Sequence, residues 1–293
     1  MSRIVKTVVA TGATSGLGFE AVKQLLHQSQ PYRFILGARD IKRSQAAYDE
    51  IKYDAGLHSI SFLPLDLSDL SDVKSFAQQT LDRLEKDKID VLFLNAGMAK
   101  KADGPGPHGS QWCEAYVVNH LSQHYLTHLL RNKLVESHSR VVVVSSGAVR
   151  NLRENDPATL VTDLKAGSKT DGFVVYRASK FVQLLGAHYW RRQFGSSCDV
   201  VAVSPGLIPN TGLGRNSTFK LDMNMPDAKS VEEGASSLLR AFTRDDFPSD
   251  PEQIFLTSWG EWWPKDVYAT TLDKELQGKW CLSKEEIEKE AGI

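Results

Sequence analysis

The feature that most constrains the fold of this chain is a regular alternation of two kinds of segment. Short apolar runs rich in β-branched residues are separated by longer stretches in which apolar residues recur at helical spacing. This alternation is typical of repeated strand–helix–strand units, which build a parallel sheet covered by helices. The run of four valines from Val141 to Val144 fits a strand that is buried on both faces. The sequence therefore predicts an α/β fold.

The predicted elements follow one another in a single series. Strands are expected at Thr7–Ala10, Arg33–Gly37, Ile60–Leu65, Val91–Leu94, Arg140–Ser145, Val200–Ser204 and Gln253–Thr257. Helices are expected at Leu17–Gln28, Lys42–Ala55, Leu70–Lys86, Trp112–Glu136 and Arg177–Phe194, and another begins near Ser230. Because no repeat or linker interrupts the series, we expect one domain over residues 1–293. Within it we expect a substrate loop at about 205–226 and a C-terminal extension at about 250–293.

The composition excludes broad classes of partner. A formal net charge of -1 lacks the basic excess that binding to nucleic acid or anionic lipid requires. Cys113, Cys198 and Cys281 are far apart and show no metal-ligand spacing, which suits a reducing compartment better than a disulfide framework. No stretch is long and apolar enough to span a bilayer, and the first residues lack the apolar core of a signal peptide. We therefore expect a cytoplasmic protein.

A glycine-rich turn, Thr-Gly-Ala-Thr-Ser-Gly-Leu-Gly at residues 11–18, lies between the first predicted strand and the first predicted helix. Glycines allow a tight turn and a close approach of a ligand to the backbone, and a helix N-terminus offers unpaired N–H groups. This arrangement predicts a binding site for a pyrophosphate; the alternative is an ordinary flexible turn. The candidate residues are Gly12, Thr14, Ser15, Gly16, Leu17 and Gly18.

Tyr176 and Lys180 are four residues apart beside a predicted helix. Residues at this spacing share a helix face, so the phenol and the ammonium can project into one site. An unperturbed phenol has a pKa of about 10, and a neighbouring cation lowers that pKa by favouring the phenolate. The pair therefore suits general acid–base catalysis near neutral pH. An exposed amphipathic turn would show the same spacing by chance.

In order and spacing, these motifs resemble the short-chain dehydrogenase/reductase family. The matching pieces are the turn at 11–18, an Asn-Ala-Gly string at 95–97, a strand-end serine pair at 145–146 and Tyr-x-x-x-Lys at 176–180. The resemblance implies a Rossmann-type doubly wound parallel sheet with helices on both faces, in a single domain with a C-terminal extension. It also implies hydride transfer between a nicotinamide cofactor and a carbonyl or alcohol.

The resemblance assigns four catalytic residues. Tyr176 is the general acid or base, and Lys180 lowers its pKa and binds the nicotinamide ribose. Ser146 holds the substrate oxygen, with Ser145 as the fallback for this role. Asn119 organises a water beside the lysine, unless it is simply a polar residue of its own helix. The resemblance implies no metal, and the sequence shows no metal-ligand cluster.

The end of the second predicted strand indicates which cofactor binds. A carboxylate there would accept hydrogen bonds from the ribose, whereas the guanidinium of Arg39 can bind a 2′-phosphate in a bidentate way. The sequence therefore favours NADP(H) over NAD(H). In the alternative, Arg39 is a solvated surface residue and Asp40 binds the ribose. Besides Tyr176 and Lys180, the resemblance implies cofactor contacts from Asp66, Leu67, Asn95, Ala96, Gly97, Pro205, Gly206 and Thr211.

The partner is expected to be a small-molecule substrate that the motifs do not identify. The long interval between Ser146 and Tyr176 and the end of the chain weakly resemble the branch of retinol dehydrogenases and protochlorophyllide reductases. One hypothesis is that Trp259, Trp262 and Trp263 wall a bulky, apolar substrate pocket together with the loop at 205–226. The alternative is that these tryptophans pack the C-terminal extension on the core or form a subunit contact.

Two helical regions receive a structural interpretation. His120, His124 and His128 share a helix face, but no carboxylate or cysteine nearby in the sequence completes a metal site, so packing roles are expected. The long helices near Trp112 and Arg177 are compatible with a dimer as well as with a monomer.

Two other functions compete with carbonyl reduction or alcohol oxidation. The same cofactor geometry suits reduction of a C=C or C=N bond, and the fold also suits a non-catalytic NADP(H)-binding sensor or scaffold. The presence of Asn119, Ser146, Tyr176 and Lys180 together weighs against the sensor.

Overall fold

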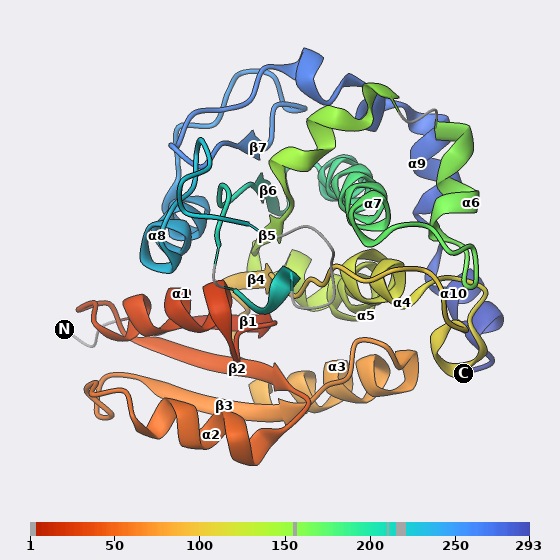
Figure 1. Ribbon diagram of the computed structural model, residues 1–293. Coiled ribbons are helices and arrows are strands. Elements are labelled where there is room, and N and C mark those ends of the chain that lie inside the picture. Colours follow the sequence, from red (N-terminus) through yellow and green to blue (C-terminus); the bar gives the residue numbers. More distant parts are fainter. Residues whose placement is uncertain (1–3, 155–156, 210, 215–220) are drawn as a thin grey trace.

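A sheet of seven strands forms the centre of the computed structural model, which describes residues 4–154, 157–209, 211–214 and 221–293. The strand order is β3-β2-β1-β4-β5-β6-β7, and every neighbouring pair is parallel (Figure 1). The predicted doubly wound α/β class is thus confirmed. The strands are β1 (Lys6–Thr11), β2 (Tyr32–Ala38), β3 (Ser59–Pro64), β4 (Val91–Leu94), β5 (Arg140–Val144), β6 (Asp199–Val203) and β7 (Phe255–Leu256).

Helices cover both faces of the sheet, as Figure 1 shows for α8 and α7 on opposite sides of β5 and β6. One face packs against α1 (Gly16–Leu26), α2 (Ile41–Asp49) and α8 (Val231–Thr243). The other packs against α3 (Leu70–Leu84), α5 (Ser122–Ser137) and α7 (Gly172–Phe194).

The valine run in β5 shows why these residues form a central strand. Val141 and Val143 belong to the core under α5 and α7, whereas Val142 and Val144 belong to the core under α1 and α8. Successive side chains of a strand point to opposite faces, so each valine is buried on its own side of the sheet. Full burial of one such side chain contributes about 1.5–3 kcal/mol relative to exposure.

The strand order reverses beside β1, and this reversal positions the site. β1 pairs with β2 on one side and with β4 on the other, so the segments that follow β1 and β4 diverge to opposite faces of the sheet. In open parallel sheets, ligands bind in the crevice outside the carboxyl ends of the strands at such a point.

The long interval between Ser146 and Tyr176, which joins β5 to α7, is not a plain loop. It contains the 3-10 helices η3 (Gly147–Glu154) and η4 (Pro157–Thr159) and the short helix α6 (Leu160–Leu164). α7 begins at Gly172, before the expected Arg177, because the Asp171 side chain caps it by accepting from the Phe173 N–H at 2.8 Å. Residues 155 and 156 lie outside the described residues, as do residues 210 and 215–220 of the expected substrate loop.

The expected helix over 112–136 is divided by a turn of π-helix. α4 (Glu114–Tyr116) leads into the π-helical turn Val117–Leu121, which continues as α5. Single π-helical turns inside α-helices occur frequently at functional sites. Here the turn carries Asn119.

The C-terminal extension covers the outer side of α5 and α7 (Figure 1). Its helices are α9 (Lys274–Trp280) and α10 (Lys284–Ala291), and α9 packs on α7 while α10 packs on α5. The chain itself therefore covers part of the surface of both long helices. The remaining short helices are η1 (Pro107–Gly109), η5 (Gly212–Gly214), η6 (Lys265–Val267) and η7 (Ala269–Leu272). Within the described ranges, no helix combines the length and the apolarity that crossing a membrane requires.

Candidate active site

A cavity of about 410 Å³ opens at the carboxyl ends of β1, β2, β4 and β5. It gathers segments that are far apart in the sequence. Of the predicted site residues, its wall contains Gly12, Thr14, Ser15, Gly16, Leu17, Arg39, Asp66, Leu67, Asn95, Ala96, Gly97, Tyr176, Lys180, Pro205 and Thr211. Four predicted residues, Gly18, Asn119, Ser146 and Gly206, lie outside the wall.

The glycine-rich turn packs so closely that two of its positions exclude a side chain. Gly12 has φ +64°, and a Cβ there would lie 2.5 Å from the Cα of Ala96. A Cβ at Gly18 would lie 2.3 Å from the Gly12 carbonyl oxygen and 2.4 Å from Nδ2 of Asn95. Gly18 therefore supports the turn from behind, which explains why it does not line the cavity.

The N-terminus of α1 faces the cavity and is free to bind an anion. Ser15 is the N-cap residue, but its side chain makes no capping hydrogen bond. All residues of α1 are described by the structure, and its first turn contains no acidic residue. The first N–H groups of a helix have no partner within the helix and carry a partial positive charge. The turn and the helix start therefore fit the pyrophosphate of a dinucleotide.

The residues after β2 distinguish between two predictions, namely that Arg39 binds a 2′-phosphate or that Asp40 binds the ribose. Asp40 caps α2 by accepting a hydrogen bond from the Arg43 N–H at 2.9 Å, so its carboxylate already has a structural role. Arg39 is exposed on the cavity wall, and within the described residues it has no ion-pair partner. A guanidinium placed in this way suits a phosphate group.

The remaining predicted cofactor contacts have identifiable local roles. The Asp66 carboxylate accepts hydrogen bonds from the N–H and the hydroxyl of Ser68, at 2.9 and 2.8 Å, which orders the turn after β3. Gly206, in the segment after β6, has φ +97°, a backbone conformation that favours glycine. The Thr211 hydroxyl donates to the Ile208 carbonyl at 3.4 Å, so this residue is weakly held beside the cavity.

Tyr176 and Lys180 project from the first turns of α7 into the cavity. The Lys180 Nζ lies 6.0 Å from the centroid of the Tyr176 ring. It donates hydrogen bonds to the Val144 carbonyl at 2.7 Å and to Oε1 of Gln183 at 2.9 Å. The ammonium is thus held between β5 and α7, on the side of the cavity where the phenol lies.

The pKa values of this pair differ from the sequence-based expectation. Burial raises the pKa of Tyr176, and a hydrogen bond from Ser146 opposes that shift. Burial also lowers the pKa of Lys180 to about 7. The raised pKa of Tyr176 is opposite to the expected lowering, because burial acts on the phenol and the Lys180 ammonium is hydrogen-bonded to Val144 and Gln183.

The two strand-end serines have different surroundings. The Ser145 hydroxyl is buried and donates to the Lys180 carbonyl at 3.3 Å. Ser146 is half-buried, accepts a hydrogen bond from the Ala148 N–H at 3.2 Å and is bonded to the Tyr176 side chain. Ser145 lines the cavity and Ser146 does not, but the interaction with the phenol favours Ser146 as the residue that meets a substrate oxygen.

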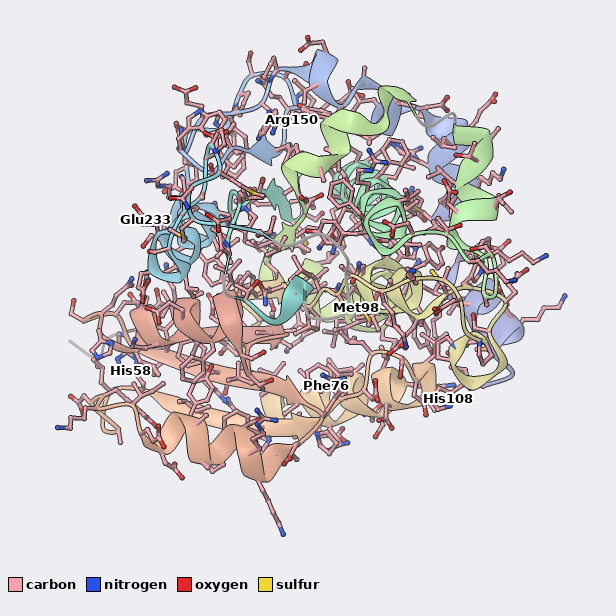
Figure 2. All side chains as sticks on the ribbon, in the orientation of Figure 1. His58, Phe76, Met98, His108, Arg150 and Glu233 are labelled. Atoms are coloured by element: carbon pink, nitrogen blue, oxygen red, sulfur yellow. The ribbon has the colours of Figure 1, made fainter. Side chains whose placement is uncertain are left out.

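Asn119 connects three parts of the site without lining the cavity. Its Oδ1 accepts from the Met98 N–H at 2.8 Å, and its Nδ2 donates to the Met98 carbonyl and to the Ser179 hydroxyl, both at 2.9 Å. Figure 2 labels Met98 where the segment after β4 meets the start of α5. A Cβ at Gly97 would lie 3.2 Å from the Lys180 Nζ and 3.7 Å from Oδ1 of Asn119, so Gly97 keeps the space between these two groups free.

Two cavity residues, Lys100 and Glu114, were not predicted from the sequence because they belong to no motif. Lys100 Nζ lies 2.5 Å from Oε2 of Glu114, and both side chains line the cavity beside Val118. Their positions could have indicated a role in the site. Lys100 follows β4 and Glu114 begins α4, and loops at this end of the sheet carry ligand contacts.

The histidines of α5 meet a cysteine that is distant in the sequence. His120, His124 and Cys281 are buried, with their ligand atoms within 4.8 Å of one another. However, Nδ1 of His124 accepts from the Trp190 indole N–H at 2.9 Å, so its Nε2 carries the proton and donates to the Leu282 carbonyl at 2.9 Å. This bonding leaves His124 no lone pair for a metal, and we interpret the cluster as the attachment of the C-terminal extension to α5.

The tryptophans after β7 pack on the body of the protein. Trp263 is buried and stacks on Phe255 at 5.5 Å, and the guanidinium of Arg150 covers its ring at 4.7 Å. Figure 2 shows Arg150 on the segment after β5, on the side of β7. Trp262 packs against Phe247 at 5.7 Å, and neither it nor the exposed Trp259 lines the described cavity. These contacts fit the packing alternative better than the pocket wall.

Comparisons with known proteins agree with this geometry. The family model described as short chain dehydrogenase matches residues 6–158. A short-chain dehydrogenase/reductase of Pestalotiopsis microspora is 67% identical over 284 residues, which cover 97% of this chain and 98% of that protein. Retinol dehydrogenase 12 of Mus musculus is 30% identical over 253 residues, covering 82% and 74% of the two chains. The solved structure of an NADPH-bound carbonyl reductase from chicken fatty liver superposes with a TM-score of 0.65 at 21% identity, covering 88% and 98%.

Proposed function

Because the chain belongs to the short-chain dehydrogenase/reductase family, we propose that it is an NADP(H)-dependent oxidoreductase acting on a carbonyl or alcohol substrate. One observation carries this proposal: the Tyr176 phenol, the Lys180 ammonium and the Ser146 hydroxyl gather beside a cavity that also contains the N-terminus of α1. The similarity to retinol dehydrogenases, predicted from weak features, agrees with the same class of reaction.

The donors around the cavity suit NADP(H). The unpaired N–H groups of α1 would hold the pyrophosphate, and Lys180 has one N–H left for the nicotinamide ribose after its two bonds to the protein. Arg39 would hold the 2′-phosphate, since Asp40 is already bonded to the start of α2. When bound, the nicotinamide supplies hydride for reduction and accepts it in oxidation.

In reduction, the Tyr176 phenol donates its proton to the substrate oxygen while the carbon receives hydride. The raised pKa of Tyr176 keeps the phenol protonated at neutral pH, which is the state that reduction requires. Ser146 donates to the same oxygen and fixes its position. The Lys180 ammonium stabilises the phenolate that remains, and Asn119 orders the segment that carries Gly97 and Met98 against the lysine. Oxidation uses the same groups in the opposite order.

We place the substrate at the Tyr176 end of the cavity, whose wall also contains Pro205, Thr211, Glu114 and Val118. We assign the described part of the segment after β6 to this end as the substrate loop. Because the wall there is mixed, with a Lys100–Glu114 ion pair beside apolar side chains, a substrate with a polar carbonyl end and an apolar body fits it.

Oxidation of NADPH across a panel of aldehydes and ketones tests this function. We expect turnover of at least one carbonyl by the wild-type protein, and turnover slower by a factor on the order of 10³ by Tyr176→Phe. Tight NADPH binding without turnover of any carbonyl, but with turnover of an activated alkene or imine, would assign the site to C=C or C=N reduction. Tight binding with no turnover at all would favour the sensor.

A further inference from the structure

Three polar side chains of α7 lie on one helix face, and two of them, Tyr176 and Lys180, line the cavity. Tyr176, Lys180 and Gln183 are spaced i, i+4 and i+7, a spacing that brings residues to the same face. Lys180 and Gln183 are only 3% and 4% exposed, so both are removed from solvent. The mechanism proposed above uses the first two residues and leaves Gln183 without a role.

Gln183 forms one of the two anchors of the catalytic lysine. Its Oε1 accepts from the Lys180 Nζ at 2.9 Å, and the Val144 carbonyl accepts from the same nitrogen at 2.7 Å. One anchor belongs to α7 and the other to the end of β5. Together they determine how far the ammonium extends toward the phenol, whose ring centroid is 6.0 Å away.

The other end of the same amide is unpaired. In the part of the chain that the structure describes, Nε2 of Gln183 is buried without a hydrogen-bond partner. Reversing the amide would direct two donors at each other, so the oxygen must face the ammonium. An unpaired buried donor is unfavourable, and an apolar side chain of similar shape would avoid that cost. The glutamine therefore has no packing advantage here, and its one polar contact is with Lys180.

The neutrality of the amide also matters for the chemistry. A carboxylate at this position would hold the ammonium equally well, but it would compensate the positive charge that stabilises the phenolate. An amide oxygen holds the ammonium and leaves that charge available to Tyr176. Burial, with only neutral acceptors nearby, lowers the pKa of Lys180 to about 7.

We propose that Gln183 is a positioning residue, which holds the Lys180 ammonium in place for Tyr176 and for the cofactor ribose without neutralising it. This inference rests on the proposed oxidoreductase function. It adds to the catalytic set a residue that touches neither the substrate nor the reacting atoms.

Gln183→Met tests the proposal, because methionine has a similar length and shape but no strong acceptor. Gln193→Met is the matched control, since Gln193 is exposed near the end of the same helix. Gln183→Glu retains the acceptor and adds a negative charge. Three quantities are measured for each variant: the pH profile of kcat for alcohol oxidation, the Kd of NADPH by fluorescence titration, and the melting temperature.

For Gln183→Met we expect kcat to fall about tenfold or more and the acidic limb of its pH profile, on which Tyr176 becomes deprotonated, to move up by about one pH unit. The Kd of NADPH should rise about fivefold, while the melting temperature changes by less than about 3 °C because an unpaired amide is removed as well. Gln183→Glu should bind NADPH nearly as the wild type does but show the same displaced limb. Gln193→Met should match the wild type in all three quantities.

The proposal is overturned if Gln183→Met keeps both the wild-type pH limb and the wild-type Kd of NADPH. A fall in melting temperature with no displacement of the limb would also overturn it, because a merely structural residue behaves in that way. If the wild-type protein turns over no substrate, the oxidoreductase function fails separately, and the NADPH titrations of the same variants still decide the role of Gln183.

Discussion

The side-chain amide of Asn95 donates a hydrogen bond of 2.8 Å to the main-chain carbonyl of Gly12. This bond connects the segment after β4 to the glycine-rich turn after β1, across the point where the strand order reverses. Gly18, on the first turn of α1, packs directly against both bonded groups. The pyrophosphate site therefore depends on a contact behind it as well as on the N–H groups that face the ligand.

Gly18→Ala should disrupt this contact. The added Cβ would lie 2.3 Å from the Gly12 oxygen and 2.4 Å from the Asn95 amide, so the turn must move or the bond must break. We expect a loss of stability of about 2–4 kcal/mol and loss of NADPH binding. Gly278→Ala is the control, because Gly278 lies inside α9 with open space around it and should gain up to about 1 kcal/mol. Urea denaturation measures the unfolding free energy of both variants. Equal changes in that free energy would contradict this account of the turn.

Arg39→Ala should change the preference between the two nicotinamide cofactors. If the guanidinium holds the 2′-phosphate, its loss removes about 1.5–3 kcal/mol of charge-assisted hydrogen bonding, which raises the Kd of NADPH roughly 10- to 100-fold. The Kd of NADH should change less than about threefold, since NADH lacks that phosphate. Lys42→Ala, on the exposed start of α2, controls for a general loss of positive charge. A uniform weakening of both cofactors by Arg39→Ala would assign Arg39 to the surface.

Acid should destabilise the attachment of the C-terminal extension. Burial lowers the pKa of His120 to about 4, below its ordinary value of 6.5. Between these two pH values the unfolded state binds a proton that the folded state does not, so the stability contributed by neutral His120 is lost as the pH falls below 6.5. From His120 alone this amounts to about 2 kcal/mol at pH 5.

His120→Gln isolates this contribution, because glutamine retains a donor for the Trp280 carbonyl but does not titrate. Between pH 7 and pH 5, the variant should lose about 2 kcal/mol less unfolding free energy than the wild type loses. His27→Gln, at the exposed end of α1, should follow the wild type. If all three proteins lose the same unfolding free energy between pH 7 and pH 5, His120 is not the cause of the loss in the wild type.

Local sequence patterns were sufficient for the fold and for much of the cavity wall. The valine run of β5 is buried on both faces because its residues alternate between two cores, and this alternation is visible in the sequence. The motif residues from Gly12 to Thr211 follow strands that end at one edge of the sheet, so their order along the chain already implies that they meet.

Contacts between distant segments were not predictable in this way. Cys281 lies beside His120 only because α9 and α10 fold back over α5 and α7, and no periodic pattern records that approach. The lowering of the Tyr176 pKa was expected from the spacing of Tyr176 and Lys180 alone. The spacing does not reveal that Val144 and Gln183 bind the ammonium or that burial acts on both groups.

The most direct test of the account is to measure cofactor binding and turnover on the same preparation of Tyr176→Phe. Removing one hydroxyl leaves the α1 N-terminus, Arg39 and the lysine anchors in place, so the Kd of NADPH should stay within about threefold of the wild-type value. If the phenol is the proton donor, kcat for carbonyl reduction should fall by a factor on the order of 10³. A variant that binds NADPH normally and still reduces the carbonyl at a rate close to that of the wild type would contradict the account.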